Sequence, residues 1–153
     1  MNKICSFFGH RKVENAEAVF KDVVNLVEKL IREKGYNIFL FGGFGEFDEL
    51  CHNAITVLKE RYPHIQRVYC VCDEKQLKKI KRCQSSFCED YERTVYFAPT
   101  FDYWYTRIYY RNCEMIKQSE CIIFYAKRQK DSGAYKALQY AIKYKKEYIN
   151  LLS

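Results

Sequence analysis

Short apolar runs alternate with longer segments of helical periodicity along nearly the whole chain. The predicted strands are residues 4–8, 38–41, 65–72, 94–98, 120–126 and 148–152, and the predicted helices are residues 14–34, 47–58, 103–118 and 132–146. Strands separated by helices of about 10–20 residues indicate βαβ units and a parallel sheet. These strands are apolar throughout, as expected when helices cover both faces of a sheet. The sequence therefore predicts an α/β protein: a Rossmann-like three-layer fold with a mostly parallel sheet of five to six strands.

A chain of 153 residues fits a single domain, and we expect residues 1–153 to form one. The polar segment 73–93 interrupts the alternation of strands and helices, and is predicted to be an irregular insertion. A segment of this length is typical of a lid over a binding site or of a long surface loop. No internal repeat or linker divides the chain.

The charge and composition favour a folded protein with anionic partners. Apolar residues make up 48% of the chain, which argues against disorder, and the net charge is +7. The alternative is a solvated lysine-rich surface, because Lys143, Lys145 and Lys146 fall on one predicted helix end. No nucleic-acid-binding fingerprint accompanies the charge, so a nucleic-acid partner is possible but not favoured.

The eight cysteines indicate a reducing compartment rather than a disulfide framework. Several of them lie inside predicted strands, where a free thiol behaves as a small core residue. The first predicted strand starts within a few residues of Met1 and leaves no room for a signal peptide. No apolar run approaches the roughly 18 residues of a membrane span. We therefore expect a cytoplasmic protein with no membrane partner.

A metal site is a weaker hypothesis. Cys70 and Cys72, with Cys83 and Cys88, offer four sulfurs, but their spacing is not that of common zinc modules. We predict no metal and no cofactor.

Five of the six glycines stand where a predicted strand passes into a helix. Ligands of open parallel sheets bind at the carboxyl ends of strands, where glycine allows close backbone approach and helix N-termini present free amides. The strongest segment is residues 41–48, FGGFGEFD. It is neither a dinucleotide-binding GxGxxG motif nor a P-loop. The alternative is a tight turn into a helix.

Charged and polar side chains follow the same strand ends. Arg11 is suited to pair with phosphate through its planar fork of donors, and His10 is either a ligand donor or a structural residue. Glu46 and Asp48 are either site carboxylates or residues that suit the helix dipole. Arg107 and Arg111 share a helix face, with surface ion pairing as the alternative role. The predicted ligand-binding residues are Gly9, His10, Arg11, Gly42, Gly43, Phe44, Gly45, Glu46, Asp48, Arg107, Arg111, Asn112, Ser132 and Gly133.

Four segments together resemble small bacterial or phage proteins of the SLOG superfamily. They are residues 5–11 (CSFFGHR), 42–48 (GGFGEFD), 111–115 (RNCEM) and 132–134 (SGA), the last followed by Tyr140-Ala141 and by residues 149–151. The match spans essentially the whole chain in the same order. SLOG proteins are Rossmann-like and related to the LOG phosphoribohydrolases and to the DNA-processing protein DprA, so the resemblance implies a ligand of nucleotide or ADP-ribose chemistry.

The resemblance also suggests residue roles. It implies that Gly42, Gly43 and Gly45 cradle phosphate and that Arg111 corresponds to the arginine of the LOG helix motif. The LOG motif Pro-Gly-Gly-x-Gly-Thr departs here at both ends, because Phe41 replaces the proline and Glu46 the threonine. The departures argue against LOG-type catalysis.

Three functions follow from these observations. The first is binding or sensing of a nucleotide-derived ligand without catalysis, with a ring from among Tyr103, Trp104, Tyr105, Tyr109 and Tyr110 stacking on the base. The second is a nucleotide N-glycosidase, whose catalytic candidates are Glu46, Asp48 and Arg111. The third is single-stranded DNA binding. SLOG relatives often oligomerise, so we also expect a homo-oligomer.

Overall fold

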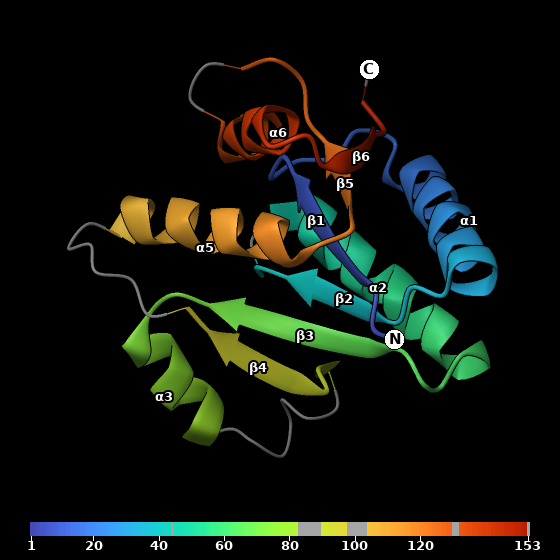
Figure 1. The fold of residues 1–153 in the computed structure, drawn as a ribbon, viewed down its shortest axis with the longest axis horizontal. Helices are drawn as coiled ribbons and strands as arrows, with labels where there is room; N and C mark the ends of the chain where they lie inside the picture. The colour runs from blue at the N-terminus through green and yellow to red at the C-terminus, as the bar shows by residue number, and fades with distance from the viewer. Residues whose placement is uncertain (44, 83–89, 98–103, 130–131, 153) are drawn as a thin grey trace.

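The computed structural model describes residues 1–43, 45–82, 90–97, 104–129 and 132–152. These residues form six strands and five helices. In chain order they are β1 (Ile4–Gly9), α1 (Ala16–Lys34), β2 (Ile38–Phe41), α2 (Gly45–Arg61), β3 (Gln66–Val71), α3 (Glu74–Arg82), β4 (Arg93–Tyr96), α5 (Trp104–Gln118), β5 (Cys121–Tyr125), α6 (Gly133–Lys143) and β6 (Glu147–Asn150) (Figure 1).

The strands form one sheet in the order β4-β3-β2-β1-β5-β6, and every pairing between them is parallel. The predicted α/β class and Rossmann-like layering are therefore confirmed. The chain runs outward from β1 through β2 and β3 to β4, and then crosses to β5 on the other side of β1. This reversal places a topological switch point between β1 and β5, and the crevice outside their carboxyl ends is the usual ligand site of such sheets.

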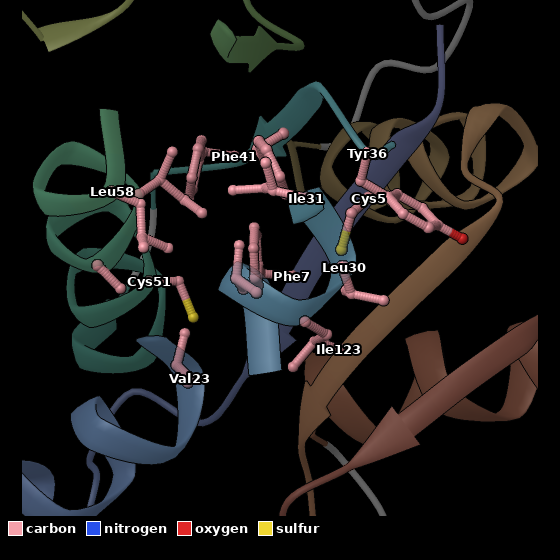
Figure 2. Close-up of a cluster of buried hydrophobic side chains, with 14 of the residues drawn as sticks. Cys5, Phe7, Val23, Leu30, Ile31, Tyr36, Phe41, Cys51, Leu58 and Ile123 are labelled. Carbon is pink, nitrogen blue, oxygen red and sulfur yellow. The ribbon is translucent and has the colours of Figure 1, made fainter. Parts of the chain in front are cut away.

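Two apolar cores sandwich the sheet. On one face α1 and α2 pack against alternate residues of the central strands, including Phe7, Phe39, Phe41 and Ile123. Figure 2 shows this cluster, in which Phe7 lies between the helices and the sheet. The other core joins the opposite residues of the strands to α5 and α6. Both faces of β2 and β5 are buried along their whole length, which explains why these strands are apolar throughout.

The structure corrects the expectation for segment 73–93. Residues 74–82 form helix α3, which connects β3 to the parallel edge strand β4. The segment is therefore partly an ordinary βαβ crossover rather than an irregular insertion. Residues 83–89, with Cys83 and Cys88, lie outside the described part of the chain.

The six described cysteines are free and buried, which the apolar strand context predicted for Cys5, Cys70, Cys72 and Cys121. Cys51 and Cys113 lie on helices α2 and α5. Among the described residues, no cluster of His, Cys, Asp or Glu side chains is arranged to hold a metal ion. None of the helices described is long and apolar enough to cross a membrane.

Candidate functional site

A cavity of about 1250 Å³ opens at the carboxyl edge of the sheet, over the switch point. Its wall includes Gly9 after β1, Gly42 after β2 and Lys127 after β5, and it is completed by residues of α5 and α6. Three strand-to-helix connections that are far apart in the sequence thus converge on one hollow. This is the arrangement that the positions of the glycines predicted.

His10 joins two of these connections. The backbone N–H of Lys127 donates to His10 Nε2 at 2.8 Å, so the proton lies on Nδ1, which is 3.3 Å from Ser132 Oγ. Burial, and then the charge of Lys127, lowers the pKa of His10 and favours this neutral form. His10 lines the cavity, but both of its ring nitrogens are engaged in holding the loops together.

The glycines after β2 make room for the protein's own side chains. A β-carbon at Gly42 would lie 2.7 Å from the Arg111 guanidinium, and one at Gly43 would lie 2.5 Å from the Tyr69 hydroxyl. Gly43 and Gly45 also have positive φ angles, of 81° and 90°. Gly9 is equally restricted, because a β-carbon there would overlap the Phe47 ring. These glycines therefore mainly allow the backbone to approach the protein's own side chains closely.

Gly133 is different. Nothing lies within 4 Å of the position of a β-carbon there, and the residue forms the first turn of α6 on the cavity wall. Ser132 is the N-cap of this helix, and its hydroxyl accepts from the backbone N–H of Tyr135 at 3.2 Å. The open N-terminus of α6 therefore faces the hollow with backbone amides that favour an anion.

Asp48 reaches back from the first turn of α2 to Gly42 and Gly43, which follow β2 and are called the glycine loop below. Its Oδ2 accepts from the backbone N–H of Gly43 at 2.9 Å, and the residue is only 8% exposed. Burial raises the pKa of Asp48 to about 6, although the Gly43 amide, Arg111 and the Gly42 amide act in the opposite direction. The protein thus places its own carboxylate on the amides of the glycine loop.

Glu46 has a structural contact of its own. Its Oε2 accepts from the backbone N–H of Val13 at 2.7 Å, and its backbone N–H donates to the carbonyl of Arg11 at 2.8 Å. These bonds tie the loop after β1 to the start of α2. The Arg11 guanidinium is exposed at the rim and has no ion pair among the described residues.

Arg111 brings a buried positive charge to the site. It is 3% exposed, its Nη1 donates to the carbonyl oxygen of Gly42 at 3.0 Å, and Asn112 Oδ1 lies 3.1 Å from its Nη2. Both residues line the cavity, but Arg107, one turn earlier on α5, does not belong to the described lining. Phe44 lies outside the described residues.

The lining is basic and carries tyrosines, of which Tyr109 was a candidate from the sequence, whereas Tyr140 and Tyr144 were not assigned to the site. Its charged side chains are Arg11, Lys12, Arg111, Lys127, Lys136 and Lys143 against Glu14 and Asp48. On the rim, Tyr140 packs against Tyr144 with ring centroids 4.5 Å apart and against Tyr109 at 6.5 Å. Tyr109 is 43% and Tyr144 54% exposed. The spacing of Lys136, Tyr140 and Lys143 on one helix face was the available signal.

A smaller cavity of about 480 Å³ lies beside the glycine loop. Glu46, Glu49, His52 and Tyr69 contribute to its wall. Arg11 and Asp48 belong to the walls of both cavities and therefore lie between the large basic one and the small acidic one.

No protein-family model matches the chain, and no curated protein matches it in sequence. Among solved structures, the chain is similar to DNA processing protein A from Helicobacter pylori, which was described for its binding of single-stranded DNA. The two share 16% sequence identity with a TM-score of 0.60. The match covers 95% of this chain but 63% of that protein. The likeness establishes a shared Rossmann-like fold.

Proposed function

We propose that the protein binds a nucleotide-type anionic ligand, without consuming it, in the large cavity at the carboxyl edge of the sheet. One observation carries the proposal: the connections after β1, β2 and β5 converge there on a single hollow with an excess of basic side chains. Ligands of doubly wound sheets bind at this place in the topology.

The phosphate subsite that we propose is the N-terminus of α6. Gly133 leaves open space, whereas the glycines after β2 are packed against the protein's own side chains. The side chains of Lys127 and Lys136 line the same cavity and supply positive charge. Helix amides and lysines together are a common means of holding phosphate.

The tyrosines on α5 and α6 offer a surface for the base. Tyr109, Tyr140 and Tyr144 form a ring cluster at the rim of the same cavity, and aromatic faces stack on nucleobases of every sequence. A volume of about 1250 Å³ also exceeds the range of roughly 300–1000 Å³ that is typical of sites for small ligands. The cavity has room for a ligand larger than a mononucleotide.

Isothermal titration calorimetry against a panel of mononucleotides, cyclic nucleotides and ADP-ribose tests the proposal. The informative variant is Lys127→Ala with Lys136→Ala, because the backbone N–H of residue 127 still bonds to His10 when the side chain is removed. We expect the double substitution to weaken binding about tenfold or more, because charge-assisted hydrogen bonds contribute a binding free energy of that size. The matched control is Lys21→Ala with Lys29→Ala on the exposed side of α1. Absence of binding by every ligand, or equal losses in both pairs, would contradict the proposal.

Single-stranded DNA binding is the second candidate, and the exposed tyrosine cluster beside Lys136 and Lys143 favours it. The fold shared with a protein that binds single-stranded DNA adds support. Fluorescence anisotropy with oligothymidylates of increasing length, at several salt concentrations, distinguishes the two candidates. DNA binding predicts affinity that grows with length and falls steeply with salt.

N-glycosidase activity is the catalytic alternative. Its two candidate carboxylates, Glu46 and Asp48, both accept hydrogen bonds from backbone amides of the loops. The raised pKa of Asp48 is the feature that suits an acid catalyst. A product assay for free base and ribose phosphate decides the matter, because a binding protein releases neither.

A further inference from the structure

We propose that Asp48 determines the charge selectivity of the cavity: its carboxylate keeps a second anionic group away from the glycine loop, and its protonation admits one. The inference rests on the proposed function, since it concerns the same cavity. It predicts that one anionic group of the ligand binds at the α6 end, and that the glycine-loop end rejects another at neutral pH.

The geometry supplies the first argument. The Gly43 amide, which would otherwise be available to a ligand phosphate, already donates to Asp48 Oδ2 at 2.9 Å. Arg111, the other group suited to an anion there, donates from Nη1 to the carbonyl oxygen of Gly42. An incoming phosphate would therefore meet a buried negative charge on the amides that it needs. In a partly dehydrated wall the two like charges would repel each other.

The surroundings of Asp48 supply the second argument, because few of them carry charge. The groups that face it are Arg111 from α5, Tyr69 and Cys70 from β3, Tyr91 from the segment before β4, and Cys51 from α2. Burial raises the pKa of each of these tyrosines and cysteines, so they stay neutral at physiological pH. Arg111 stays charged. Asp48 is thus the member of this group whose charge changes between pH 5 and 8, with a pKa of about 6.

Two histidines require controls. His10 lines the large cavity and His52 the small one, so the effect of Asp48 has to be separated from any effect of these side chains. They are separated from the effect of Asp48 by Asp48→Asn, which removes the charge, retains an oxygen to accept from Gly43 and leaves both histidines in place.

The experiment compares two probes whose charge does not change with pH. Phosphate monoesters titrate near pH 6 and would confuse the result, whereas phosphodiesters keep one charge per phosphate. The probes are cyclic AMP, with one diester, and the trinucleotide dTpTpT without terminal phosphates, with two. Affinities are measured by calorimetry at pH 5.5 and pH 7.5 for the wild type, Asp48→Asn and Glu17→Gln. Glu17 is the matched control, since it is an exposed carboxylate in the first turn of the neighbouring helix α1.

We expect the wild type to bind dTpTpT about 25-fold more tightly at pH 5.5 than at pH 7.5, because the protonated fraction of Asp48 rises by that factor. Cyclic AMP should show a much smaller change. Asp48→Asn should bind dTpTpT at pH 7.5 as tightly as at pH 5.5, and Glu17→Gln should behave as the wild type.

Three results would overturn the inference. One is an affinity for dTpTpT that does not depend on pH in the wild type. Another is a pH dependence that persists in Asp48→Asn, which would assign it to a histidine. The third is failure of dTpTpT to bind at either pH; the proposed function is overturned as well only if every nucleotide of the calorimetry panel also fails to bind. The first two results leave the proposed function intact.

Discussion

Replacing Asp48 with asparagine should stabilise the protein at alkaline pH and lose much of that effect in acid. The folded state raises the pKa of Asp48 from 3.8 to about 6, because burial disfavours the charged form of its carboxyl group. A shift of this size corresponds to about 3 kcal/mol of preference for the protonated form. Because the folded pKa lies above the unfolded one, the stability from this site is present in full below about pH 4. It is lost as the pH rises through about 6.

The quantity to measure is the change in the free energy of unfolding between pH 8 and pH 5. Over that interval the wild type gains about 1.4 kcal/mol at this site, whereas Asp48→Asn gains nothing. Urea denaturation of both proteins at the two pH values gives the four free energies of unfolding, and Glu17→Gln serves as the control. The advantage of the asparagine variant should shrink by about 1.4 kcal/mol at pH 5. A difference between the two proteins that is equal at both pH values, or larger at pH 5, would refute the reasoning.

Three further substitutions test the packing around the site. Gly9→Ala should destabilise the protein by about 1–3 kcal/mol in thermal or urea unfolding, because its methyl group overlaps the buried Phe47 ring. Gly133→Ala should change stability by less than about 0.5 kcal/mol, since open space surrounds it, but should weaken nucleotide binding in calorimetry. Glu92→Ala should lower the free energy of unfolding in urea by about 2–3 kcal/mol without affecting ligand affinity. The Arg67 side chain is only 6% exposed, and the substitution removes the carboxylate that lies 2.7 Å from its guanidinium.

The layout of the fold was readable because the central strands β2 and β5 are buried on both faces. Runs such as residues 121–125 and 38–41 have no polar interruption, so their type and order could be predicted directly from the sequence. Helix α3 was missed for the converse reason. Its sequence, EKQLKKIKR, has two apolar residues in nine, so helical periodicity has little signal there.

The convergence of the loops was also predictable, since the carboxyl ends of parallel strands share one edge of the sheet. The side-chain contacts inside the site could not be predicted from the sequence. That Gly42 accommodates Arg111 and that Gly43 accommodates Tyr69 depends on α5 and β3, which meet the loop only in three dimensions. The same holds for the tyrosines of the rim, because Tyr109 and Tyr140 are brought together by the packing of α5 against α6 (Figure 1).

The central claim is that the carboxyl-edge cavity holds the phosphate of a nucleotide-type ligand, and amide chemical-shift mapping by NMR tests it most directly. Titration of the ¹⁵N-labelled protein with the tightest nucleotide found by calorimetry should shift the amide resonances of Arg11, Lys127 and Gly133. The amides of Arg67 and Glu92, which lie at the amino ends of β3 and β4, should stay in place. Shifts confined to the amino edge of the sheet, or saturating binding that leaves the Gly133 amide unmoved, would contradict the claim.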